Sequence, residues 1–65
     1  MLSKSNVQTM DVNMLISIVN MKLRNDFSSL SSLCSSFEIN EAELVERLLS
    51  AEFKYESELN QFISK

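Results

Sequence analysis

The chain has 65 residues, 45% of them hydrophobic, and a formal net charge of −3, which is the composition of one small folded domain. It contains neither glycine nor proline, which disfavours tight hairpin turns and phosphate-binding loops and favours an all-α fold. A single cysteine excludes an internal disulfide, and the absence of histidine removes the usual general base and the usual zinc ligand.

The first nine residues are polar and aperiodic, and we expect residues 1–9 to form a flexible tail before one helical domain at residues 10–65. They lack the apolar core of a signal peptide. The longest apolar run, residues 14–19, is interrupted by Ser17 and is far shorter than the roughly 20 residues that span a bilayer. A free thiol without an export signal indicates a protein of the reducing cytoplasm that does not enter a membrane.

The first helix is predicted from Val12 to about Arg24, with Asp11 as its N-cap and Asn25 as a left-handed terminator. It carries two apolar stripes at helical spacing. The first stripe consists of Val12, Leu15, Ile16, Val19 and Leu23, and the second of Met14, Ile18 and Met21. Such a helix either packs on two sides inside the domain or uses one stripe to bind a partner.

Residues 28–36 contain six serines, yet apolar residues recur there with the period of a helix. We expect a helix capped by Ser28 or Ser29 that buries Leu30, Leu33, Cys34 and Phe37. The next start signal is a capping box formed by Asn40 and Glu43, which predicts a helix from Glu41 to about Ala51. The turn between these helices is only three residues long, with Glu38 in a left-handed conformation. This spacing is typical of a helix-turn-helix.

The C-terminal segment permits two interpretations. Phe53 and Tyr55 alternate as in a strand, whereas Leu59, Phe62 and Ile63 have helical spacing. We expect a short extended piece followed by a short helix, and a wing-like β-hairpin is the alternative. The predicted fold is therefore an all-α three-helix bundle, with helices 2 and 3 in a helix-turn-helix arrangement and a short aromatic segment packed across them.

Several blocks of sequence resemble, in order, the bacterial domain-of-unknown-function family 4250. They are residues 13–24 (NMLISIVNMKLR), 29–34 (SLSSLC), 53–55 (FKY) and 58–62 (ELNQF). The resemblance covers about residues 13–62 and implies a short, stand-alone bacterial protein, but no activity. Two departures are the serines on the outer face of the second helix, where the family leads us to expect acidic residues, and Glu52 in place of a glycine.

Nothing in the sequence assembles a catalytic site, a metal site or a cofactor site, so we expect no enzyme, no cofactor and no small-molecule substrate. Cys34 lies on the apolar face of its helix, where a structural thiol is the natural interpretation, because reactive thiolates need an electropositive and partly exposed setting. The glutamates do not follow the spacing of a calcium loop.

A helix-turn-helix raises the question of DNA binding, because the second helix of that motif enters the major groove. Here that helix would present Glu41, Glu43 and Glu46. Residues 28–65 carry seven glutamates against Arg47, Lys54 and Lys65, a net charge of −4. Phosphate contacts supply most of the affinity for nucleic acid, so this charge argues against DNA. A nucleic-acid-binding regulator remains the alternative hypothesis.

Non-catalytic binding of another protein, or of a second copy as a homodimer, fits the sequence better. The candidate partner-binding residues all lie on the first helix: Met14, Ile18, Asn20, Met21 and Arg24. Methionine side chains repack easily and suit an adaptable contact. In the competing interpretation the methionine stripe is ordinary core, and Asn20 and Arg24 cap helix ends or bind the C-terminal segment.

Overall fold

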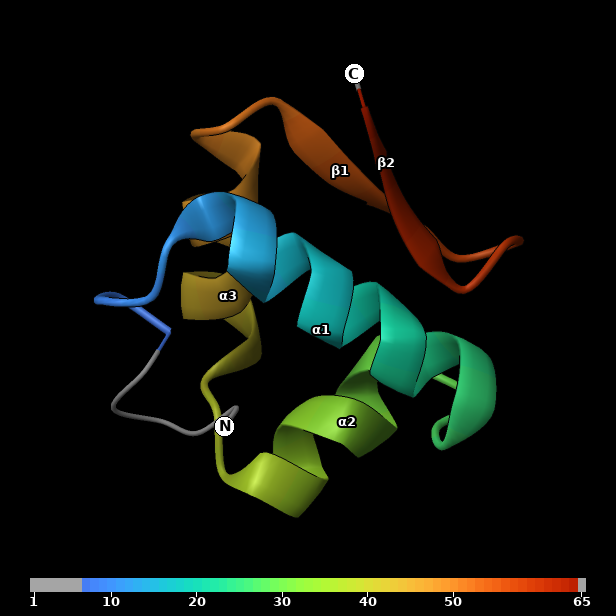
Figure 1. The fold of residues 1–65 in the computed structure, drawn as a ribbon. Helices are drawn as coiled ribbons and strands as arrows, with labels where there is room; N and C mark the ends of the chain where they lie inside the picture. Colours follow the sequence, from blue (N-terminus) through green and yellow to red (C-terminus); the bar gives the residue numbers. More distant parts are fainter. Residues whose placement is uncertain (1–6, 65) are drawn as a thin grey trace.

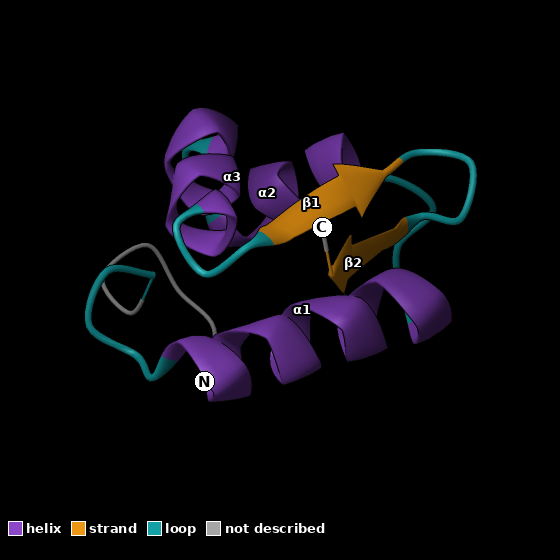
Figure 2. Cartoon of the chain, turned by 90° about the horizontal axis from the view of Figure 1, so that it is seen from above, coloured by secondary structure: helices purple, strands orange, loops and turns teal. Residues whose placement is uncertain are grey.

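Three helices followed by a two-stranded antiparallel sheet make up residues 7–64, the part of the chain that the structure, a computed structural model, describes. The elements are α1 (Val12–Asn25), α2 (Leu30–Phe37), α3 (Glu41–Leu49), β1 (Phe53–Glu56) and β2 (Gln61–Ser64) (Figure 1). Seen from above, α1 lies on one side and α2 and α3 on the other (Figure 2). The hairpin lies across the opening between them, with β2 against α1 and β1 against α3.

The C-terminal segment corrects the all-α prediction, because its described residues, 53–64, form a β-hairpin and not a short helix. Tyr55 pairs with Phe62 across the two strands, and their ring centroids lie 5.4 Å apart. Residues 57–60 make the turn, in which the Leu59 amide donates to the Glu56 carbonyl and Asn60 takes a left-handed conformation at φ 53°. Asparagine tolerates this region better than most residues, so the lack of glycine did not exclude a hairpin.

Each of the three helices begins at a side-chain cap that the sequence predicts. The Asp11 carboxylate accepts hydrogen bonds from the amides of Asn13 and Met14, the Ser29 hydroxyl from Ser32, and the Asn40 side chain from Glu43. These bonds satisfy amides that lack a partner within the helix.

The helix ends agree less well with prediction. Glu38 is left-handed as expected, at φ 57°. Asn25 is not a left-handed terminator, since it is the last residue of α1, and the C-cap that follows is Asp26 with φ −120°. α3 ends at Leu49, two residues earlier than expected, and Glu52 then takes φ 67° to turn the chain into β1. Among the described residues, three connections between elements thus contain a non-glycine residue in the left-handed conformation, namely Glu38, Glu52 and Asn60.

The core lies between the three helices and is closed by the hairpin. Its buried members are Val7, Leu15, Ile16, Val19, Leu23, Leu30, Leu33, Cys34, Ile39, Leu44, Leu48 and Phe62. Of the four residues that the spacing of the second helix predicted to be buried, Leu30, Leu33 and Cys34 are buried and Phe37 is half-buried. Of the four apolar residues expected to face inward from the third helix, Leu44 and Leu48 are buried, Val45 is half-buried and Leu49 is exposed. The expected tail at residues 1–9 lies largely outside the described residues, but Val7 is part of the core.

Candidate functional site

The two apolar stripes of α1 face in different directions. Leu15, Ile16, Val19 and Leu23 are buried, whereas the side chains of Met14 and Met21 are 57% and 50% exposed. Seven residues are almost two turns of helix, so Met14 and Met21 lie along one line, on the side of the helix away from the core. Ile18 lies beside that line and is half-buried. The first stripe therefore belongs to the core, whereas the second leaves its two methionines on the surface.

Asn20 binds the hairpin and does not point to solvent. Its side-chain nitrogen donates to the Phe62 carbonyl over 3.0 Å, and its side-chain oxygen accepts from the Phe62 amide over 2.7 Å. A carboxamide has the donor and acceptor of a peptide group, so one side chain satisfies both main-chain atoms of a strand residue. Among the roles considered for Asn20, these bonds correspond to binding of the C-terminal segment.

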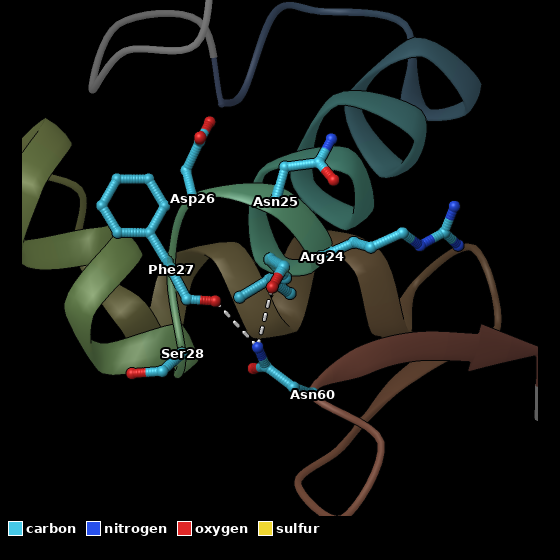
Figure 3. A pocket seen from close by; sticks show the side chains of 7 residues that line it. Arg24, Asn25, Asp26, Phe27, Ser28 and Asn60 are labelled. Carbon is cyan, nitrogen blue, oxygen red and sulfur yellow. Dashed lines mark hydrogen bonds between the residues drawn. The ribbon is translucent and has the colours of Figure 1, made fainter.

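Two further amide side chains attach the hairpin to α1, and no pattern in the sequence predicts them. Gln61 donates to the Asn20 carbonyl over 3.0 Å. Asn60 donates to the carbonyls of Leu23 and Phe27, each over 2.9 Å (Figure 3), and accepts from the Tyr55 hydroxyl over 2.7 Å. Asn60 thus satisfies a terminal carbonyl of a helix that lies more than thirty residues away in sequence. Local pattern rules do not detect a cap of this kind.

A shallow depression of about 500 Å³ surrounds Asn60. It is lined by Leu23, Arg24, Asn25, Asp26, Phe27, Ser28 and Asn60 (Figure 3). The labelled side chains of Arg24, Asn25 and Asp26 point away from one another, and the amide of Asn60 is already bound on both its atoms. No set of polar groups converges here to hold a small molecule.

The side chain of Arg24 is exposed near the end of α1 and has no ion pair or hydrogen bond within residues 7–64. Its neighbour Lys22 is engaged, because its ammonium lies 3.9 Å from the Asp26 carboxylate and 5.7 Å from the centre of the Phe37 ring. The exposed face of α1 therefore ends in one unpaired cation.

The outer face of α3 is acidic, and the arginine of this helix does not lie on that face. Arg47, the basic residue of this helix, turns toward the N-terminal segment and donates to the Met10 carbonyl over 3.0 Å. Glu41, Glu43 and Glu46 are exposed. Since the arginine does not lie among the carboxylates, it does not offset their repulsion for a polyanion.

Cys34 is 3% exposed, and burial together with the nearby Glu41 carboxylate raises the pKa of its thiol to about 11. The thiol is therefore protonated at neutral pH, which suits a structural residue and not a nucleophile. Among residues 7–64 no cluster of potential metal ligands occurs, and no helix has the length and apolar character to cross a membrane.

These observations define a class: a small α+β protein in which a C-terminal hairpin closes three helices and one face of the first helix keeps exposed methionines. The chain belongs to the domain-of-unknown-function family DUF4250, whose family model matches residues 9–62. The resemblance seen in the sequence is thereby confirmed and extends slightly further toward the N-terminus. Comparisons with curated proteins and with solved structures gave no match.

Proposed function

We propose that this protein is a non-catalytic protein-binding module of the cytoplasm and that it binds through the exposed face of α1. The binding face consists of Met14, Ile18 and Met21, with Arg24 at its end. The observation that carries the proposal is the exposure of Met14 and Met21, which are 57% and 50% accessible on the face of the helix that points away from the core.

The chemistry of this face suits a protein partner. Unbranched thioether side chains adapt to the shape of an apposed apolar surface, which is why methionine is common at adaptable binding surfaces. An unpaired arginine at the border of an apolar patch adds a charged hydrogen bond that restricts the choice of partner. Asn20 is not part of the binding face, since the Phe62 main chain occupies its carboxamide.

A nucleic-acid role is less well supported. The helix that would enter the major groove presents exposed glutamates, and its arginine binds the Met10 carbonyl. We therefore expect no shift of mixed-sequence DNA at low salt, the condition that most favours electrostatic binding. A shift that disappears as salt is added would favour the regulator hypothesis.

The binding face is tested by placing a photoreactive amino acid at position 14 or position 21 and irradiating the source cells. Leu59 supplies the matched control, because it is an apolar side chain with 61% exposure that lies in the hairpin turn. We expect crosslinked species from positions 14 and 21 and none from position 59. Absence of adducts at 14 and 21, or equal adducts at all three positions, would exclude the binding face.

A further inference from the structure

We propose that the binding face of α1 is occupied by a second copy of this chain, with the two α1 helices antiparallel about a two-fold axis that passes between Ser17 and Ile18. This inference rests on the proposed function and names its partner. Two observations carry it: the arrangement of apolar side chains along the exposed line of α1 and the charges at its two ends.

The apolar side chains match themselves when one helix is turned around. An axis between Ser17 and Ile18 places Met14 opposite Met21 of the second copy, and Ser17 opposite its Ile18. Met14 and Met21 are roughly 10 Å apart along the helix, at equal distances from the axis. Ser17 is small and exposed, so the two helices approach closely at the crossing point and the isoleucines enter the contact. The contact then buries four methionines and two isoleucines.

The same register pairs opposite charges at both ends of the contact. Asp11 comes to lie opposite Arg24 of the second copy. Both capping bonds of Asp11 use its Oδ2 atom, so Oδ1 is free to accept from a guanidinium. Arg24 has no partner within residues 7–64. A parallel pair would instead bring Asp11 against Asp11 and Arg24 against Arg24, so the charges select the antiparallel arrangement.

The other exposed elements are poor surfaces for self-association. Two α3 helices would bring six exposed glutamates together. Joining two hairpins through β1 would bring together the charged side chains of Lys54 and Glu56, which form an ion pair at 3.5 Å on that strand. Charged side chains on an edge strand discourage strand pairing between molecules.

The proposed contact is small. A helix of 14 residues is roughly 21 Å long, and one face of it buries less than the roughly 1,200 Å² at which stable interfaces begin. We therefore expect a dimer that dissociates at micromolar concentrations, and it should appear as a concentration-dependent mass in sedimentation equilibrium of the wild-type chain.

The register is tested by disulfide trapping in a Cys34→Ala background. Ser17→Cys lies next to the axis and should form a covalent dimer on mild oxidation, whereas Ser36→Cys, an equally exposed serine on α2, should not. In a mixture of Met14→Cys with ¹⁵N-labelled Met21→Cys, mass spectrometry should find mainly mixed dimers. A statistical mixture of the three dimers, or equal trapping at positions 17 and 36, would overturn the arrangement.

The charge pairing is tested in the wild-type background, which avoids any effect of the Cys34 substitution on folding. Arg24→Glu should weaken the dimer by about five- to tenfold, since two surface attractions become repulsions. Lys54→Glu makes the same charge change away from the contact and should leave the mass distribution unchanged. Equal effects of the two variants would overturn the pairing.

The two proposals fail in different ways. A wild-type chain that stays monomeric to millimolar concentration, together with photo-adducts from positions 14 and 21 on another protein, overturns the homodimer and supports the binding face. A monomer without such adducts overturns both. Adducts with the chain itself, together with a concentration-dependent mass, support both.

Discussion

Two regions that pack against α1 are held there by different kinds of contact. α2 and α3 contribute fully buried apolar side chains, including Leu33, Leu44 and Leu48. The hairpin also buries Phe62, but it is tied to α1 by the carboxamides of Asn20, Asn60 and Gln61. Apolar burial tolerates small displacements, whereas a set of bidentate amides requires each atom in its place. The helical region should therefore set the stability, and the hairpin junction should set the geometry.

The largest effect is expected where the apolar region is broken. Leu33→Ala leaves a cavity at a side chain with no exposure and should cost about 2–5 kcal/mol. Since a 65-residue chain has only about 5 kcal/mol of stability to lose, we expect circular dichroism to show melting about 10 °C or more below the wild type. Leu59→Ala, at an exposed leucine, should melt within a few degrees of the wild type. Similar melting of both variants would contradict this account of the core.

The next largest effect is expected where the polar junction between the hairpin and α1 is broken. Asn20→Leu leaves the Phe62 amide and carbonyl without partners, which should cost about 2–4 kcal/mol. Hydrogen exchange should show β2 losing protection well before α2 and α3 do, because a two-stranded hairpin is not stable alone. Asn13→Leu, at an exposed asparagine on the same helix, is the control. Uniform loss of protection along the chain would show that the two regions are not separable.

The buried thiol of Cys34 makes the stability of the apolar region depend on pH, and this dependence can be measured. Its pKa is raised in the folded state from 9.0 to about 11, so the native chain holds the proton more tightly than the unfolded chain does. This contribution is fully present below pH 9 and is lost as the pH rises toward 11, by about 2–3 kcal/mol in all. The difference in free energy of unfolding between wild type and Cys34→Ala, measured by denaturant melts, should shrink above pH 9 and be smallest near pH 11. Parallel curves would indicate an unperturbed thiol.

A smaller effect sharpens the role of Asn60, which combines a left-handed backbone with three side-chain hydrogen bonds. Asn60→Ala removes those bonds and also strains the backbone, so it should lower the free energy of unfolding by about 2 kcal/mol. Asn60→Gly removes the bonds without the strain and should therefore lower it by about 1 kcal/mol less. Thermal melts give the difference. If alanine and glycine are equivalent, the backbone conformation carries no cost.

The smallest effect is a gain. Glu38 links α2 to α3 at φ 57°, where a residue with a Cβ is disfavoured. Its side chain is exposed, and Glu38→Gly should stabilise the fold by up to about 1 kcal/mol. Glu41→Gly, inside the first turn of α3, is the opposing control and should destabilise it. A loss of stability in Glu38→Gly would mean that this carboxylate makes a favourable interaction.

The sequence predicts this molecule well wherever a periodic pattern or a local cap decides the structure. The starts of the helices at Asp11, Ser29 and Asn40 follow from hydrogen bonds within three residues, and the buried face of α3 follows from its 3.6-residue period. The prediction of a helix in the C-terminal segment is wrong because Leu59, Phe62 and Ile63 have the spacing of a helical stripe. The structure of this segment depends instead on the pairing of Tyr55 with Phe62 and on the hydrogen bond between Asn20 and Phe62, which are contacts that local sequence patterns do not report.

The candidate site was predictable in part. Met14, Ile18 and Met21 could be grouped by spacing, but whether they lie in the core depends on where the hairpin packs, which the sequence did not specify. Asn20 was grouped with Arg24 because both are polar and one turn apart on the helix. The structure separates them, since one binds the hairpin and the other is exposed.

The pair of bonds between Asn20 and Phe62 also has a consequence for how the sheet is aligned. A carboxamide that holds both the amide and the carbonyl of one strand residue acts as a one-residue substitute for a third strand. A slip of β2 by one position would turn Phe62 away from the core and present the wrong main-chain atoms to the helix. A single asparagine thereby works as a register lock, in a sheet too short for its own ladder to enforce alignment.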